Sequence, residues 1–252
     1  MSARSSRPSV AELRAATQPP GIFERNSGEH WAGKLYIRRY SPYLTRVLLP
    51  LHPNTVTVLM ILDGVAAGAI LALPGWEPMV GAFLLIQLQI LLDCSDGEVA
   101  RWKGISSPVG IYLDRVGHWL TETALPIGLG VHAHRPVLGL VAAILQLLIK
   151  GETAVVHVAR NEAGLGPVQD RRDVVAPRTS GLRALRRLAG RAPFYRAFVA
   201  MEFTLLALVA AIGDEIAGSL DVTRGLLYGL IAAGALTVAG HGFAILTSDR
   251  LR

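Results

Sequence analysis

Residues 93–118 have the sequence DCSDGEVARWKGISSPVGIYLDRVGH, which places acidic side chains directly against long apolar segments. Asp93 and Asp96 are three residues apart and share one face of a helix, whereas Asp114 and His118, four apart, share a face of the next helix. Two such helices joined by a short loop would bring three carboxylates and an imidazole into one cavity. The stretch therefore predicts both a helix–loop–helix arrangement and the place where the chemistry lies.

The rest of the chain has the composition of a membrane protein. Of its 252 residues, 51% are hydrophobic and only 17% are charged, whereas about 25% of a soluble domain is charged. Apolar segments that approach or reach the roughly 20 residues needed to cross a bilayer lie at about 55–73, 79–94, 108–131, 136–160, 195–213 and 223–247. The sequence thus predicts an all-α integral membrane domain over residues 53–252, with six transmembrane helices and both termini on one side.

Two more polar regions precede this domain. Residues 1–29 are rich in Ser, Arg and Pro and predict a flexible cytoplasmic tail. Residues 30–52 mix aromatic and apolar side chains with basic ones, which predicts an amphipathic helix on the membrane surface, divided by Pro42. A helix that covers part of the membrane bundle is an equally good interpretation of the second region.

The basic residues predict an orientation. The net charge is +6, and in a membrane protein such an excess orients loops and meets anionic lipid more often than it binds nucleic acid. The 160–194 loop contains a cluster of arginines: Arg160, Arg171, Arg172, Arg178, Arg183, Arg186, Arg187 and Arg191. The positive-inside rule then places this loop, the 95–107 loop and both termini in the cytoplasm. We expect a multi-pass protein of the inner (plasma) membrane whose site faces the cytoplasm.

The acidic residues of the stretch predict a metal site. Carboxylates so close together repel one another unless they are protonated or a cation neutralises them. Hard oxygen ligands favour magnesium, manganese or calcium, and such a site suits metal-bound phosphates. Gly97 allows close approach of the backbone to a ligand, and Arg101 supplies a guanidinium fork for phosphate oxygens. A water-filled pore lining or a buried ion-pair network would explain the charges but not their spacing.

The spacing resembles the signature of the CDP-alcohol phosphatidyltransferase family. The matching positions are Asp93, Asp96, Gly97, Ala100, Arg101, Gly110 and Asp114. The Ser107-Pro108 pair and the Pro53-Asn54-x-x-Thr57 opening of the first apolar segment are weaker points of similarity. The motif covers residues 93–118, and the predicted six-helix topology extends the resemblance over most of the chain after residue 30.

The resemblance implies a six-helix fold, commonly a homodimer, with a cytoplasm-facing cavity and two divalent ions, Mg²⁺ or Mn²⁺. It implies metal binding by Asp93, Asp96 and Asp114 and binding of the CDP moiety by Gly97, Ala100 and Arg101, with Ser107, Gly110, Asn54 and Thr57 as further candidates. In that family an acceptor hydroxyl attacks the phosphorus bonded to the donor's alcohol, and CMP leaves. The implied partners are CDP-diacylglycerol or another CDP-alcohol, a small alcohol or polyol phosphate, and membrane lipid, with no nucleic acid.

His118 departs from the family pattern, which has a fourth aspartate at this position. That aspartate is usually assigned as the general base and as a possible metal ligand. Histidine can do either, because its ordinary pKa of about 6.5 suits a base and its neutral ring binds metals. We therefore predict that His118 is catalytic together with Asp114 and is also a metal ligand. Glu122, one turn further on, is a second candidate base or a partner that orients His118. Alternatively His118 only bonds a neighbour, and activity is altered or lost.

Three basic side chains are candidates for binding a phosphorylated acceptor. Arg160 and Arg196 lie at the ends of the fourth and fifth apolar segments, and His157 lies one turn before Arg160. Snorkelling of both arginines to lipid headgroups is an equal alternative.

Deeper in the fourth apolar segment lie Lys150 and Glu152. We predict that these two form a structural ion pair with Glu122 or Asp63 rather than binding substrate.

The leading hypothesis is an enzyme of phospholipid biosynthesis that joins CDP-diacylglycerol to an alcohol such as inositol phosphate or glycerol phosphate. In a second version the CDP carries the polar alcohol and a lipid hydroxyl attacks. A rival of another class is a non-catalytic family member that binds a CDP ligand or metal as a sensor or scaffold. His118 leaves this rival open, whereas the otherwise intact motif argues against it. A transporter would show internal repeats, and the sequence shows none.

Overall fold

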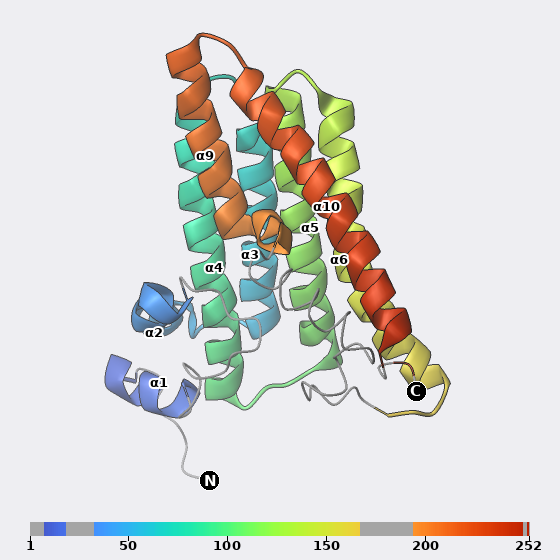
Figure 1. Ribbon diagram of the computed structural model, residues 1–252. Helices are drawn as coiled ribbons and strands as arrows, with labels where there is room; N and C mark the ends of the chain where they lie inside the picture. Colours follow the sequence, from blue (N-terminus) through green and yellow to red (C-terminus); the bar gives the residue numbers. More distant parts are fainter. Residues whose placement is uncertain (1–7, 19–32, 167–193, 249–250, 252) are drawn as a thin grey trace. The chain divides into compact units, whose positions relative to one another are not determined.

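The computed structural model describes residues 8–18, 33–166, 194–248 and 251, and these residues form helices and no strands (Figure 1). The chain divides into two compact units. The first contains residues up to 67 and residues 81–121, and the second contains residues 68–80 and those from 122 onward.

Four helices are long and apolar enough to cross a membrane: α3 (Pro53–Leu71), α4 (Glu77–Lys103), α6 (Pro136–Glu162) and α10 (Asp221–Thr247). The all-α membrane fold is therefore confirmed. The other two predicted spans correspond to α5 (Pro108–His132) and α9 (Ala200–Ala217), which do not meet the same criteria of length and composition. Six spans thus stay a prediction.

Helix α4 is longer than predicted. We expected a loop at 95–107, but α4 continues to Lys103 and only residues 104–107 connect it to α5. It ends at Gly104, whose φ of 65° suits glycine. Ile105 N donates to Ala100 O at 3.0 Å in this helix-ending turn. The prediction was wrong because falling hydropathy marked the start of a polar face, not the end of the helix. The signature residues 93–101 therefore lie on one continuous helix.

Helix α5 begins with a capping arrangement. The hydroxyl of Ser107 accepts a hydrogen bond from Gly110 N at 3.0 Å, and Pro108 occupies the first helical turn, where its missing N–H needs no partner. Ser107, Pro108 and Gly110 therefore have a local structural role at the turn between the two signature helices.

The N-terminal region contains a helix where a flexible tail was predicted. Helix α1 (Val10–Thr17) starts with a capping box in which Ser9 Oγ accepts from Glu12 N and Glu12 Oε2 accepts from Ser9 N. The buried Leu13 packs with Leu49 and Val99 in the first unit. The composition of the segment did not indicate this helix, because an eight-residue helix is only marginally stable alone. Here its packing against the rest of the first unit stabilises it. The remainder of 1–29 lies outside the described residues.

Pro42 does not divide the segment before the membrane domain. A short π-helical turn (Gly33–Ile37) leads into α2 (Arg38–Leu48), and α2 continues through Pro42. Since proline has no N–H, the carbonyl of Arg38 loses its helical donor, and Gln18 Nε2 donates to it instead at 2.8 Å. A contact from another helix thus compensates the break that proline would otherwise cause.

Both predicted roles of α2 are compatible with its two faces. Ser41 and Thr45 are buried within the first unit, so α2 covers part of that unit. Its opposite face exposes apolar and aromatic side chains, namely Leu35 in the preceding turn, Tyr40, Tyr43 and Val47. Such a face suits a membrane surface, and that placement stays a prediction.

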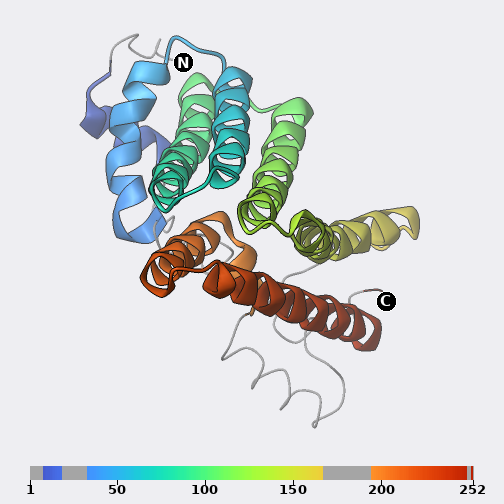
Figure 2. The ribbon, with the colours of Figure 1, turned by 90° about the horizontal axis from the view of Figure 1, so that it is seen from above.

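In the second unit, α10 packs against α6 and α9 (Figure 2). The fifth predicted segment is broken, because a 3₁₀ turn (Phe194–Phe198) precedes α9 and Val199 between them is extended. Gly234 of α10 allows close packing there, since a β-carbon would lie 3.0 Å from atoms of both Leu145 and Phe198.

Candidate metal and nucleotide site

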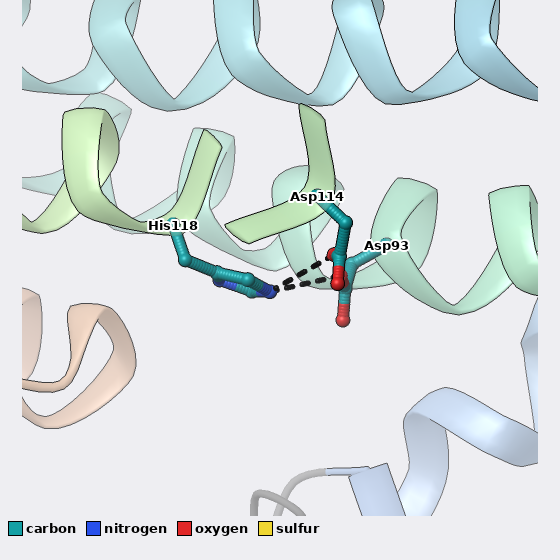
Figure 3. A group of neighbouring side chains, drawn as sticks. All are labelled: Asp93, Asp114 and His118. Atoms are coloured by element: carbon teal, nitrogen blue, oxygen red, sulfur yellow. Dashed lines mark hydrogen bonds and ion pairs between the residues drawn. The ribbon is translucent and has the colours of Figure 1, made fainter. Parts of the chain in front are cut away.

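Three ionisable side chains meet between α4 and α5 in the first unit. His118 Nε2 lies 3.1 Å from Asp93 Oδ1 and 3.5 Å from Asp114 Oδ1, so the ring bridges the two carboxylates (Figure 3). Asp114 and His118 lie one helical turn apart on α5 and face Asp93 of α4. All three side chains are partly exposed, which leaves the cluster open to a ligand.

This cluster has the dimensions of a metal site. One potential ligand atom from each of the three residues lies within 4.8 Å of the others. A divalent cation bound at about 2.0–2.6 Å separates its ligand atoms by at most about 4–5 Å, so the three donors fit one ion. Two carboxylate oxygens and one imidazole nitrogen are an ordinary donor set for a divalent metal.

Asp96 is held apart from this group by a residue of α3. Its Oδ2 accepts a hydrogen bond from Thr57 Oγ1 at 2.7 Å, and the Thr57 hydroxyl also lies 3.2 Å from Pro53 O. The structure thus places Thr57, a predicted cofactor-binding residue, against a predicted metal ligand. In this arrangement the carboxylate of Asp96 has a hydroxyl partner, and its role as a metal ligand stays a prediction.

Asn54 lies near the beginning of α5. A β-carbon on Gly110 would lie 3.2 Å from Asn54 Oδ1 and 3.3 Å from Ser107 Oγ, so a larger residue would press on both side chains. The weak similarity at the first apolar segment and the signature glycine therefore lie next to each other in the structure. Their predicted contact with the nucleotide remains untested.

Gly97 and Arg101 are neighbours on α4. A β-carbon at residue 97 would lie 3.1 Å from Arg101 Nη1, so glycine leaves room for the guanidinium along the helix surface. Arg101 Nε donates to Thr17 O at 2.7 Å, which ties the side chain to the end of α1. Ala100 contributes its carbonyl to the helix-ending turn and is partly exposed. The binding roles of all three stay predictions.

Sequence reasoning missed Glu98, which lies between the signature positions and is completely buried. Its carboxylate accepts hydrogen bonds from Ser41 Oγ at 2.6 Å, Thr45 Oγ1 at 2.7 Å and Gln18 Nε2 at 2.8 Å. The sequence feature that could have identified Glu98 is an acidic residue on the apolar side of a signature helix.

Arg38 of α2 was also missed as a residue of the site; its positive charge attracts the Asp93 carboxylate and repels the guanidinium of Arg101. The available signal was a basic residue at the start of the segment before the membrane domain. The site of the first unit therefore includes α2 as well as the two signature helices.

Glu122 has partners of its own in the second unit. It is buried, forms an ion pair with Lys150 Nζ at 2.9 Å and accepts a hydrogen bond from Gln146. This confirms the predicted structural ion pair for Lys150 and Glu122. Glu152 was also predicted to pair with Glu122 or Asp63; its Oε2 instead lies 3.1 Å from His241 Nδ1. A role for Glu122 as a base stays a prediction.

Loss of Lys150 should therefore act on stability. We expect Lys150→Met to lower the free energy of unfolding by about 1–2 kcal/mol, because Glu122 would keep its buried charge with one partner fewer. That corresponds to a melting temperature lower by roughly 2–8 °C in detergent. The double variant Glu122→Gln/Lys150→Met should recover most of the loss. An unchanged melting temperature with weaker acceptor binding would contradict the structural role.

The three acceptor-binding candidates lie in the second unit. Arg160 is buried and donates to the carbonyls of Leu165 at 2.8 Å and Gly166 at 3.1 Å, beyond the end of α6. Arg196 lies 3.6 Å from Glu202, and His157 is exposed on α6. The remaining arginines of the predicted cytoplasmic loop lie outside the described residues.

The fold and the site define a class: a helical membrane protein in which two aspartates and a histidine on two signature helices are arranged so that they could hold a metal ion. A model of the CDP-alcohol phosphatidyltransferase family matches residues 50–212, more than half of the chain. The chain therefore belongs to this family.

A relative with an assigned product is archaetidylinositol phosphate synthase of Aeropyrum pernix. The two proteins are 36% identical over 118 residues, which cover 44% of this chain and 56% of the relative. The chain thus spans about half the length of the relative it matches.

Proposed function

We propose that this protein transfers a phosphatidyl or related phospho-alcohol group from a CDP-linked donor to an alcohol and releases CMP, as a step of phospholipid biosynthesis. The observation that carries the proposal is the cluster of Asp93, Asp114 and His118 at signature positions of the family. Its ligand geometry suits a divalent cation, and its partial exposure suits a diphosphate substrate.

The residues have distinct tasks in this proposal. Asp93, Asp96 and Asp114 hold one or two divalent ions, Mg²⁺ or Mn²⁺, which when bound would neutralise the diphosphate and the leaving group. His118 Nε2 lies 3.1 Å from Asp93 Oδ1 and 3.5 Å from Asp114 Oδ1, so once these carboxylates hold the ions, its lone pair can accept the proton of the acceptor hydroxyl. The hydroxyl oxygen then bonds to the phosphorus that carries the donor's alcohol, and the bond from that phosphorus to CMP breaks.

The donor is bound along the signature face of α4 and by the neighbouring turn. Gly97, Ala100 and Arg101 contact the CDP moiety, with support from Asn54, Thr57, Ser107 and Gly110. The packing of Asn54 and Thr57 onto this face supports the assignment. A guanidinium suits phosphate oxygens because it donates two parallel hydrogen bonds.

For the acceptor we favour a phosphorylated polyol. The name of the archaeal relative includes an inositol phosphate, and Arg160, Arg196 and His157 offer cations for such a group. CDP-diacylglycerol is our proposed donor. We also propose a homodimer in the plasma membrane with its site toward the cytoplasm, on the strength of the arginine distribution and the family resemblance.

CMP release by the purified protein tests this function. With CDP-diacylglycerol and Mn²⁺ or Mg²⁺, we expect CMP only when a suitable alcohol is present, and a panel of inositol phosphate, glycerol phosphate and unphosphorylated alcohols should identify it. A chelator should abolish release. Release of CMP from a CDP-linked polar alcohol in the presence of a lipid hydroxyl would instead support the second hypothesis, in which the CDP carries the polar alcohol and the lipid is the acceptor. Binding of cytidine nucleotides without any release would favour the non-catalytic sensor or scaffold.

A further inference from the structure

A buried carboxylate joins three helices of the first unit. Glu98 of α4 is fully buried and receives hydrogen bonds from three neutral donors, Ser41 and Thr45 of α2 and Gln18 at the end of α1. Burying a carboxylate is unfavourable unless its oxygens are hydrogen-bonded, so each of these donors matters. Glu98 immediately follows Gly97 and lies one turn before Arg101.

Gln18 is the point at which the three helices meet. Its Nε2 donates to Glu98 Oε1 at 2.8 Å and to Arg38 O at 2.8 Å, and it lies 3.4 Å from Ser41 Oγ. The Arg38 carbonyl is available because Pro42 cannot donate to it. Only 8% of Gln18 is exposed, so water is a poor substitute for the lost donor if the side chain is shortened.

The preceding residue holds the proposed phosphate-binding arginine. Thr17 O accepts from Arg101 Nε at 2.7 Å. Two consecutive residues at the end of α1, Thr17 and the capping residue Gln18, therefore contact two residues of α4 that lie one helical turn apart, Arg101 and Glu98. Figure 1 shows α1 and α2 beside the end of α4 that leads into the signature turn.

We propose that Gln18 is a positioning residue for the nucleotide. By bonding Glu98 and the Arg38 carbonyl, it fixes the end of α1, and the carbonyl of Thr17 then orients the guanidinium of Arg101 toward the diphosphate of the CDP-linked donor. The helix before the membrane domain is thus a part of the donor site. This inference rests on the proposed function for the identity of the nucleotide.

Two substitutions at Gln18 test this role in the full-length protein. Gln18→Met keeps the volume and removes the donor, whereas Gln18→Ala also removes the packing. We expect both to raise the KM for CDP-diacylglycerol about tenfold, as loss of a hydrogen bond to a charged group does. The KM for the acceptor should stay within about twofold, because the proposed function assigns Arg101 to the donor. The affinity for CMP, measured by calorimetry with Mn²⁺, should fall by a similar factor.

Arg14 offers a matched control. Arg14 Nη2 donates to Arg39 O at 2.8 Å, so Arg14→Ala removes a side-chain bond from α1 to a neighbouring carbonyl of α2 without touching α4. We expect this variant to keep the donor KM and the CMP affinity of the wild type. Equal changes in the Arg14 and Gln18 variants would show that general loosening of α1, not positioning, is responsible, and would overturn the proposal.

An exchange of the two side chains provides a rescue. Gln18→Glu should impair CMP binding more than Gln18→Met, because two carboxylates would then face each other. In Gln18→Glu/Glu98→Gln, the side-chain NH₂ of residue 98 can donate a hydrogen bond to the new carboxylate. Its carbonyl oxygen can accept a hydrogen bond from a hydroxyl of α2. We expect this double variant to bind CMP more tightly than Gln18→Glu alone but less tightly than the wild type, because the new carboxylate cannot donate to the Arg38 carbonyl as Gln18 does. A CMP affinity no higher than that of Gln18→Glu would contradict a direct contact between residues 18 and 98.

The two readouts separate this inference from the proposed function. A wild-type protein that binds CMP but releases none from any CDP-alcohol would refute the function. The CMP affinity of the Gln18 variants could still be measured by calorimetry. Donor KM and CMP affinity unchanged in Gln18→Met would overturn the positioning role even in an active enzyme. Wild-type protein that neither binds nor releases CMP would overturn both.

Discussion

Asp93→Asn is expected to lower kcat for CMP release on the order of 10³-fold or more, or about 4 kcal/mol in activation free energy. Asp93 is the residue of α4 in the cluster, and its Oδ1 also lies 3.1 Å from His118 Nε2. The amide is nearly the same size but removes the negative charge, so the divalent ion loses a ligand and His118 loses an ionic partner. Mn²⁺ binding, followed by calorimetry, should weaken together with the rate.

Glu77→Gln provides the matched control for this experiment. Glu77 lies on the same helix, at its first residue, and is exposed. The substitution removes the same charge from α4 far along the chain from the cluster, so we expect the rate and Mn²⁺ affinity to stay within about twofold. An Asp93→Asn protein that is folded and binds Mn²⁺ normally would show that the cluster is not the metal site.

The second large effect concerns His118. We expect His118→Ala to lower kcat by about 10²–10⁴-fold, the usual contribution of a positioned acid or base. His118→Asp restores the family's fourth aspartate and should keep activity within about tenfold of the wild type, because a carboxylate can also accept the proton and bind metal.

The dependence on metal distinguishes the two roles of His118. An imidazole nitrogen binds the later first-row metals better than it binds Mg²⁺, whereas carboxylates suit Mg²⁺ and Mn²⁺ alike. If His118 is a ligand, the ratio of Mn²⁺-supported to Mg²⁺-supported release should fall in His118→Asp. If this ratio is unchanged in His118→Asp and His118→Ala is slow, His118 acts as the general base and not as a metal ligand. Wild-type activity in His118→Ala would contradict both.

Much of the site could be predicted because its residues are related by local geometry. The spacing of three residues between Asp93 and Asp96, and of four between Asp114 and His118, places each pair on one face of any α-helix. Asp93, Asp114 and His118 lie together as predicted, whereas Asp96, the third predicted carboxylate, is hydrogen-bonded to Thr57 instead. The all-α membrane class followed from apolar segment length, which the bilayer thickness imposes on any spanning helix.

Helix ends were harder to predict than helices. Ser95 and Glu98 are buried, and α4 continues through them, because their polar groups find partners on the chain. Hydropathy alone cannot register those partners. The helix ends at Gly104, where the chain needs a positive φ, and that signal is local.

The family signature, the membrane class and the faces on which the acidic residues lie could be read along the chain, because each is a pattern within one helix or within two consecutive helices. Which distant residues complete the site depends on how the helices pack. The bond from Gln18 to Glu98 joins residues 80 positions apart, and the Arg38 carbonyl is open to Gln18 only because Pro42 lies one turn later in the same helix. Such pairings depend on the register between packed helices, which the pattern along any single helix does not specify.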